Sequence, residues 1–101
     1  MKCLDDCHNY ELENFIGGLK PVSLVFYRRP PTGPEIPGTT NEEVLKVLIH
    51  RLTFLNETWM DGKFRCRENS LAITKLEEAL MWLEKRTADR VKRGVEATQE
   101  K

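Results

Sequence analysis

Proline occurs only in the N-terminal part of the chain, and this asymmetry constrains the fold more than any other feature of the sequence. All five prolines lie between residues 21 and 37, whereas the apolar residues after residue 39 recur at helical spacing. Proline interrupts both helices and central strands. We therefore expect two parts: residues 1–38, with a strand and a proline-rich connector, and a helical domain over residues 39–101.

Two long helices are predicted in the C-terminal part, over residues 40–60 and 67–93. Each has one apolar seam whose members are three and four residues apart. The first seam is Leu45, Leu48, Leu52, Leu55 and Trp59, and the second is Ile73, Leu76, Leu80, Leu83 and Thr87. A capping box at residues 40–43 begins the first helix, Asp61-Gly62 ends it, and Gly94 ends the second. Because the connecting loop is short, the helices should pack antiparallel as a hairpin.

Each predicted helix also carries a second apolar stripe. The first helix has Val44, Val47 and Phe54, and the second has Ala72, Ala79 and Trp82. Two helices cannot bury two faces each, and a chain of 101 residues builds only a thin core. The N-terminal strand could cover part of this surface and another subunit the rest. The sequence thus predicts a mainly α fold, a long antiparallel helical hairpin with a short N-terminal β and irregular segment, that assembles as a homo-oligomer.

One strand is predicted in the N-terminal part, over residues 21–29, where β-branched and aromatic residues are frequent. A lone strand needs a hydrogen-bonding partner, which could be another subunit or the stretch near Tyr10–Phe15. Residues 1–20 are acidic, and we expect them to be irregular, with a turn at Gly17-Gly18. Residues 30–37 should form a connector without helix or central strand.

The charge and the motifs argue against several classes of function. The 16 basic and 16 acidic residues give a formal net charge of +0, so a DNA-binding protein is not indicated. No apolar run approaches the ~20 residues that span a bilayer, so we expect a cytosolic protein with no membrane partner. The sequence lacks the motifs of phosphate loops, metalloproteases and hydrolases, and His8 and His50 lie far apart. We predict neither an enzyme nor a bound cofactor.

Three cysteines, Cys3, Cys7 and Cys66, make an odd number, which argues against a disulfide framework and for reduced thiols. Together with His8 they could supply metal ligands. A zinc knuckle, however, usually has a second closely spaced cysteine pair, which this sequence lacks. The preferred interpretation is a set of small, half-buried side chains near a mobile terminus, and no metal site is predicted.

Anion binding is better supported than catalysis. Arg65, Arg67, Asn69 and Ser70 gather at the predicted start of the second helix. Free backbone amides and the positive end of the helix dipole favour phosphate at such a position. The alternative is that Asn69 or Ser70 merely caps the helix while the arginines remain in water.

A basic stripe and several aromatic rings are further candidates for nucleotide recognition. Arg86, Arg90 and Arg93 follow one face of the second helix, although complementation of the helix dipole explains them equally well. The aromatic residues on or beside the hairpin are Phe54, Trp59, Phe64 and Trp82. Bases stack on such rings, although each ring taken alone is more typical of a core. Phe54 lies one turn from Arg51, so an interface with another copy could hold both a base and a phosphate.

The second predicted helix contains a specific motif. It combines the pair Arg67-Glu68, a small polar residue, the pattern A-x-T-x-L-E-E-A from Ala72 to Ala79, and Met81-Trp82. This stretch resembles the helical hairpin shared by phage anti-CBASS and anti-Thoeris proteins. The tail from residues 86 to 90, continuing from 93 to 96, is also similar. The resemblance covers residues 39–98, whereas the first 40 residues depart from the family's pattern.

The resemblance implies a sponge, a phage protein that sequesters the cyclic nucleotide messengers of bacterial immunity in the host cytoplasm without cleaving them. Members assemble as hexamers and bind cyclic di- or trinucleotides, or cyclic ADP-ribose derivatives, between subunits. The expected ligand-binding residues are Arg51 and Arg67 for phosphate, Asn69, Ser70 and Thr74 as hydrogen-bond donors, Phe54 for stacking, and Arg86 and Arg90 on the basic stripe. The alternative is a non-enzymatic helical protein-protein interaction module, an adaptor, whose second stripes bind another protein.

Overall fold

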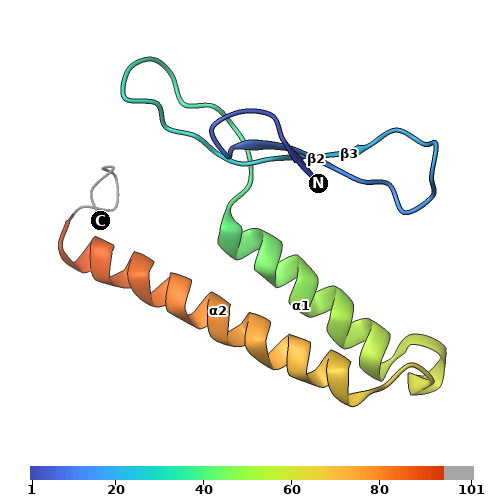
Figure 1. The fold of residues 1–101 in the computed structure, drawn as a ribbon. Coiled ribbons are helices and arrows are strands. Elements are labelled where there is room, and N and C mark those ends of the chain that lie inside the picture. The colour runs from blue at the N-terminus through green and yellow to red at the C-terminus, as the bar shows by residue number, and fades with distance from the viewer. Residues whose placement is uncertain (95–101) are drawn as a thin grey trace. The chain divides into compact units, whose positions relative to one another are not determined.

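The computed structural model describes residues 1–94, and the chain separates into two units, Met1–Asn41 and the part that begins at Glu42. The first unit holds the strands β1 (Lys2–Cys3), β2 (Asn9–Leu12) and β3 (Val22–Val25). The helices are α1 (Asn41–Glu57) and α2 (Arg67–Lys92), with a 3-10 turn, Trp59–Gly62, between them (Figure 1). The assignment of residues 1–38 and 39–101 to separate domains stays a prediction. Val95 and Glu96, part of the tail resemblance, lie outside the described residues.

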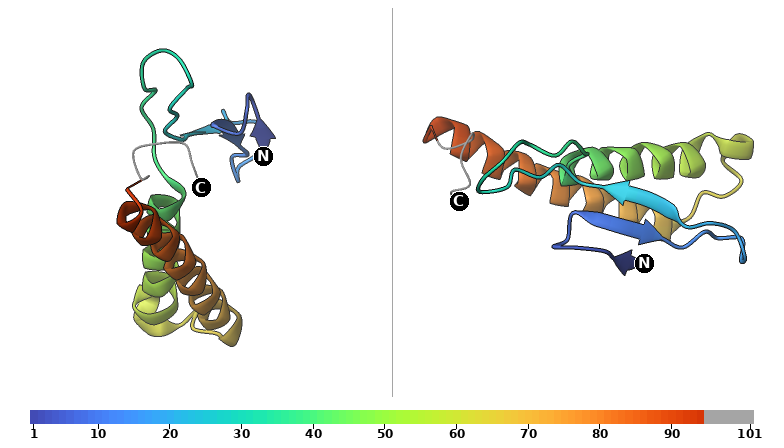
Figure 2. Two further views of the ribbon diagram at one scale, coloured as in Figure 1. Left: turned by 90° about the vertical axis from the view of Figure 1, so that its left-hand side faces the viewer. Right: turned by 90° about the horizontal axis from the view of Figure 1, so that it is seen from above.

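The two helices run antiparallel and side by side, as the predicted hairpin requires (Figures 1 and 2). The predicted seam of α2 is confirmed, because all of its members are half-buried while most of their neighbours are exposed. These residues are Ile73, Leu76, Leu80, Leu83 and Thr87. Their spacing of three and four residues keeps them on one face of the helix, and Leu80 of this face lines a concavity together with Ile49 of α1.

The predicted seam of α1 is only partly correct. Leu45, Leu52 and Leu55 are half-buried, but Leu48 is 39% exposed and Trp59 is 46% exposed. Ile49 is half-buried in place of Leu48. Steps of three and four residues from Leu45 both stay near one face of a helix, so spacing could not decide between these two residues. Trp59 follows the end of α1 and therefore cannot continue its seam.

The ends of the helices follow from local backbone conformation. The first helix ends at Glu57, three residues before the predicted boundary, because Met60 and Asp61 adopt left-handed φ angles of 49° and 58°. The second spans Arg67–Lys92, within one residue of the predicted range. Gly94 has a φ of 75° and donates a backbone hydrogen bond to the Val91 carbonyl, as expected for a C-terminal glycine.

The described part of the chain has no apolar core of its own. Among residues 1–94 no hydrophobic side chain is buried, and the single buried residue is Asn56, at 4% exposed. Of the predicted second stripes, Val47, Phe54 and Trp82 are all exposed, and Val44 is half-buried. The hairpin thus leaves large apolar side chains exposed to water, and the assembly into an oligomer stays a prediction.

The N-terminal unit is more regular than predicted. The expectations of a single strand and of an irregular stretch over residues 1–20 are wrong, because β1, β2 and β3 form an antiparallel sheet in that order. Tyr10 pairs with Leu24, so β3 finds its partner within its own chain, near the predicted stretch Tyr10–Phe15. The strands β1 and β2 have two and four residues, too short for an alternation pattern to be distinctive.

The third strand is shorter than the predicted range of residues 21–29. It ends at Val25, after which Phe26 and Arg28 form single bridges to Thr39 and Ile36. Gly38 lies so close to this segment that an added Cβ would overlap the backbone of Phe26. The remaining part of the proline-rich connector forms no helix and no extended strand, as expected.

A search of the described residues for a helix with the length and apolarity needed to cross a bilayer finds none.

Candidate functional site

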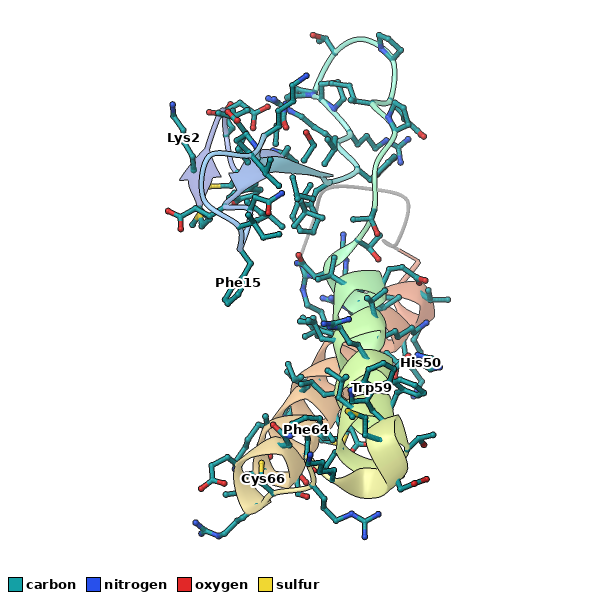
Figure 3. All side chains as sticks on the ribbon, turned by 90° about the vertical axis from the view of Figure 1, so that its right-hand side faces the viewer. Lys2, Phe15, His50, Trp59, Phe64 and Cys66 are labelled. Atoms are coloured by element: carbon teal, nitrogen blue, oxygen red, sulfur yellow. The ribbon has the colours of Figure 1, made fainter. Side chains whose placement is uncertain are left out.

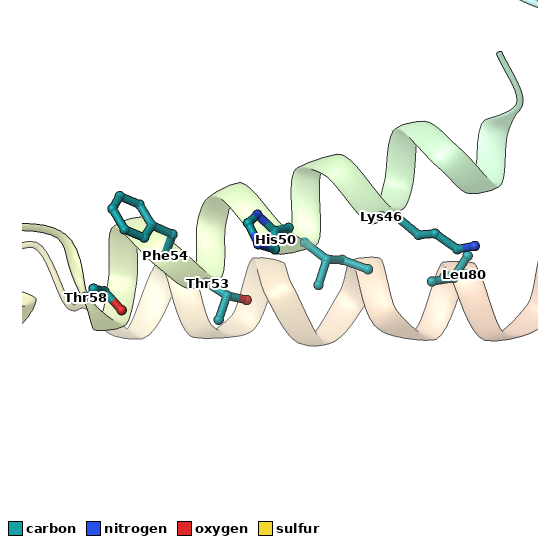
Figure 4. A pocket seen from close by; sticks show the side chains of 7 residues that line it. Lys46, His50, Thr53, Phe54, Thr58 and Leu80 are labelled. Atoms are coloured by element: carbon teal, nitrogen blue, oxygen red, sulfur yellow. The ribbon is translucent and has the colours of Figure 1, made fainter.

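A groove on α1 is a concave surface of the hairpin. Lys46, His50 and Phe54 line two adjoining concavities of about 460 and 760 Å³. Because they are four residues apart, they lie above one another on one face of the helix (Figure 4). The smaller concavity is also lined by Ile49, Thr53, Thr58 and Leu80, and the larger by Glu43, Val47 and Arg51. We call this surface the α1 groove, and it is shallow and open to solvent.

The α1 groove combines an apolar wall with two cations, Lys46 and Arg51, and one carboxylate, that of Glu43. Ile49 and Leu80 are half-buried, whereas Lys46 and Arg51 are exposed. A guanidinium or ammonium group forms strong hydrogen bonds to phosphate, and the ring of Phe54 can stack on a nucleobase. The groove therefore has the chemistry needed to hold an anion that carries a flat aromatic group.

Phe54 is paired with a second aromatic ring. Its ring centroid lies 5.9 Å from that of Trp59, with an angle of 52° between the planes. Phe54 is nevertheless 43% exposed, so part of its ring faces solvent. Sequence reasoning identified Phe54 and Arg51 but did not include Lys46 or His50 among the candidate ligand residues. The repeated spacing of four residues from Lys46 to Phe54 was the available signal.

The predicted phosphate site at the start of α2 has a different cap from the one expected. Cys66 is the N-cap, and its Sγ accepts a hydrogen bond from the Asn69 backbone N–H at 3.4 Å. The alternative that Asn69 or Ser70 caps the helix is therefore wrong. Arg67 is exposed at the first position of α2. The guanidinium of Arg65 lies close to Gly62, where an added Cβ would be 3.6 Å from Arg65 Nη2.

The three polar residues predicted to donate to a ligand make hydrogen bonds within the hairpin. Asn69 Nδ2 donates to the Phe64 carbonyl at 3.3 Å, and Ser70 Oγ donates to the Cys66 carbonyl at 3.3 Å. Thr74 Oγ1 donates to the Ser70 carbonyl at 3.1 Å. The Asn69 bond closes the turn, whereas Ser70 and Thr74 each bond to a carbonyl one helical turn earlier. Phe64 and Cys66 lie at this end of the hairpin, as Figure 3 shows.

Asn56 organises the turn, and sequence reasoning missed it. Its Nδ2 donates to Ser70 Oγ at 3.2 Å, and its Oδ1 accepts from the Cys66 backbone N–H at 3.0 Å. One side chain from α1 thus holds both the cap and the first turn of α2. An asparagine in a helix gives no sequence signal for such a role, because a surface position has the same pattern.

The remaining predicted residues, Arg86 and Arg90, lie on α2 away from the turn in sequence. Arg86 is exposed and Arg90 is half-buried. Close to them in the sequence, Lys85 Nζ pairs with Asp89 Oδ2 at 2.9 Å. Neither arginine is among the residues that line the α1 groove. Of the eight predicted ligand residues, the groove therefore contains Arg51 and Phe54, while Asn69, Ser70 and Thr74 are brought together at the turn.

The cysteines do not assemble with other ligands. The Sγ atoms of Cys3 and Cys7 lie 3.9 Å apart, and Cys66 caps α2. Within residues 1–94, no group of three histidine, cysteine, aspartate or glutamate side chains is arranged to hold a metal ion.

Comparison with known proteins assigns the chain to a family. Residues 24–88, which include α1 and most of α2, match the family model described as the Acb2/Tad1 hairpin domain. A curated relative, Thoeris anti-defense 1 of Bacillus phage SBSphiJ7, is 47% identical over 90 residues, which cover 89% of this chain. The matched region spans 59% of that relative's length. The match to the family model extends over more than half of the chain, and the chain belongs to the Acb2/Tad1 hairpin-domain family.

Proposed function

We propose that the chain is a phage anti-defence protein that binds a cyclic nucleotide messenger of bacterial immunity and withholds it without cleaving it. The messenger is a cyclic di- or trinucleotide or a cyclic ADP-ribose derivative, and the protein acts in the cytoplasm of the infected host. Membership of the Acb2/Tad1 hairpin-domain family and the similarity to Thoeris anti-defense 1 of a Bacillus phage support this proposal.

The observation that carries the proposal is the composition of the α1 groove. A cyclic nucleotide offers negative phosphates and flat bases in one small molecule. Lys46 and Arg51 supply positive charge to the groove, and Phe54 supplies an exposed ring beside an apolar wall. In this proposal Arg51 contacts phosphate and Phe54 stacks on a base.

The proposal includes self-association, in a homo-oligomer that we expect to be a hexamer. The exposed apolar faces of α1 and α2 support it, because water contact of so many large side chains is unfavourable. A neighbouring copy would bring Arg67, Asn69, Ser70 and Thr74 to the ligand as phosphate-binding and hydrogen-bonding groups. Arg86 and Arg90 would supply a second basic pair from α2 at the same interface.

Titration calorimetry with a panel of cyclic di- and trinucleotides and cyclic ADP-ribose isomers tests the proposal. We expect at least one member to bind with a Kd below about 10 μM, equivalent to roughly −7 kcal/mol. The ligand recovered after denaturation of the complex should be chemically unchanged. No binding below that concentration across the panel, or a hydrolysed ligand, contradicts the proposal.

A matched pair of lysine variants locates the site. Lys46→Ala removes a cation of the groove, and we expect the affinity to fall about tenfold or more, the effect of one lost charge-assisted hydrogen bond. Lys75→Ala is the control, because Lys75 is an exposed helical lysine that pairs with Glu78 at 3.9 Å outside the groove. Equal affinities of the two variants would place the ligand elsewhere.

The second candidate function is a protein-protein adaptor, which the exposed apolar faces also favour. An adaptor would bury these faces against a different protein. Mass measurement in solution separates the two candidates. A closed homo-oligomer that is stable without any partner supports messenger binding, whereas a monomer or a polydisperse species supports the adaptor.

A further inference from the structure

The turn between β1 and β2 has a well-defined hydrogen-bond network. One carboxylate oxygen of Asp5, Oδ1, accepts from the backbone N–H groups of His8 and Asn9, both at 3.0 Å. The Leu4 N–H donates to the Asn9 carbonyl at 2.8 Å. Cys7 closes the turn with a left-handed φ of 65°. The Asp5 carbonyl accepts from Cys3 Sγ at 2.8 Å and from the Cys7 backbone N–H at 2.6 Å, so the turn holds both cysteines.

The thiols of Cys3 and Cys7 are close together. Their Sγ atoms are 3.9 Å apart, and both residues are exposed. A disulfide needs a sulfur-sulfur distance of about 2.05 Å, so its closure requires the two side chains to rotate from their present rotamers. Cys66 has a separate structural role as the cap of α2.

The pKa of Tyr10 is sensitive to these thiols. Tyr10 lies directly opposite Cys3 in the register of β1 and β2, and its ring packs edge to face against Phe26 at 5.9 Å. A hydrogen bond with the Cys7 side chain, followed by burial and the nearby Cys7 and Cys3 thiolates, raises the pKa of Tyr10 to about 12. A change in the chemical state of the thiols therefore alters the environment of the phenol.

We propose that Cys3 and Cys7 form a reversible oxidation site, at which an intramolecular disulfide closes across the β1–β2 turn. The oxidant is a small-molecule disulfide of the glutathione class. The thiolate of one cysteine attacks this disulfide and releases one thiolate, and the second cysteine then attacks the mixed disulfide and releases the other. The two cysteines lose two protons and two electrons, and the reagent becomes two thiols. This inference is independent of the proposed function.

Mass spectrometry of the full chain in a glutathione redox buffer, followed by alkylation of the remaining thiols, tests the disulfide. We expect the oxidised protein to lose the mass of two hydrogen atoms and to carry one alkyl group, on Cys66. Cys66→Ser should form the same disulfide and carry no alkyl group, since serine is also a good N-cap. Two retained glutathiones, persistent alkylation of both Cys3 and Cys7, or a bond to Cys66 would overturn the proposal.

The single variants Cys3→Ser and Cys7→Ser provide the matched controls. Each retains one cysteine of the turn and cannot close the disulfide. We expect each to accept one glutathione at that cysteine under the same conditions. If either variant still lost two hydrogen atoms, the bond would involve Cys66 and the assignment would be wrong.

Spectrophotometric titration of Tyr10 gives an independent measurement. Tyr27→Phe leaves Tyr10 as the one tyrosine of the chain. In the reduced protein Tyr10 should titrate near its pKa of about 12. The disulfide removes the thiolates and the thiol hydrogen bond, so the pKa in the oxidised protein should fall toward the ordinary value of 10.0. An unchanged Tyr10 pKa after oxidation would contradict the proposed bond.

Discussion

Asn56 on α1 donates a hydrogen bond to Ser70 on α2, with a distance of 3.2 Å from Nδ2 to Oγ. The same side chain accepts from the Cys66 backbone N–H, so the cap of α2 depends on a residue of α1. Asn56 is also the single buried residue among residues 1–94. The turn of the hairpin is thus held by a polar contact and not by an apolar core.

Replacement of Asn56 should weaken the whole hairpin. In Asn56→Ala the Cys66 N–H loses its acceptor and Ser70 Oγ loses its donor. We expect the free energy of unfolding to fall by about 1–3 kcal/mol, the net contribution of two hydrogen bonds. Urea unfolding followed by circular dichroism measures this change. The exposed neighbour gives the control, since Glu57→Ala should change stability by no more than about 0.5 kcal/mol. Equal stability of the two variants would show that the Asn56 contacts contribute nothing.

We expect the local structure to require glycine at position 38, because the chain passes close to the backbone of Phe26 there. A methyl group at this position overlaps backbone, and overpacking of this kind costs about 1–3 kcal/mol. We expect Gly38→Ala to accelerate hydrogen exchange at the amides of Tyr27 and Thr39, which bond across this segment at 2.8 and 2.9 Å. Gly17→Ala is the matched control, because a Cβ there meets no atom within 4 Å. Unchanged exchange in Gly38→Ala would contradict the steric argument.

The helical part of the fold could be predicted because its signals are repeated over many residues. Five positions of α2 at spacings of three and four residues identified its buried face, and residues 67–93 were within one residue of its true ends. The seam of α1 was harder, since Leu48 and Ile49 fit the spacing equally well. Strands of two and four residues carry too little pattern to be recognised, so β1 and β2 were missed.

The candidate site could be predicted only in part. Arg51 and Phe54 were identified from the chemistry of their side chains. Lys46 and His50 were not, although their spacing of four residues places them on the same helix face as Phe54. Asn69, Ser70 and Thr74 appeared to be free donors in the sequence, whereas in the hairpin they bond to backbone carbonyls. The hydrogen-bond partner of each polar side chain depends on the three-dimensional shape of the turn. Residue types alone do not determine this shape.

The stability of the sheet should depend on Tyr10 at high pH. The pKa of Tyr10 is raised to about 12 from 10.0, so the folded state favours the neutral phenol. This contribution is fully present below pH 10.0 and is lost as the pH rises through about 12. We expect Tyr10→Phe to lose less stability than the unmodified chain over this interval, measured by urea unfolding at each pH. Parallel losses in both proteins would contradict the prediction.

Trp82 should be part of the interface between copies. It is 57% exposed on α2, and Trp82→Glu places a charge on the apolar face. Burial of an unpaired charge is strongly unfavourable, so we expect this variant to sediment as a smaller species than the unmodified protein. Glu84→Ala, at an exposed position two residues further along α2, should leave the assembly intact. An unchanged mass for Trp82→Glu would remove this face from the proposed interface.

Native mass spectrometry of the protein mixed with the best-binding cyclic nucleotide tests the proposed function most directly, because it reports assembly and ligand together. We predict a closed homo-oligomer that carries bound messenger of unaltered mass. A monomer without ligand, or an assembly that holds only cleaved nucleotide, would contradict messenger sequestration at shared sites.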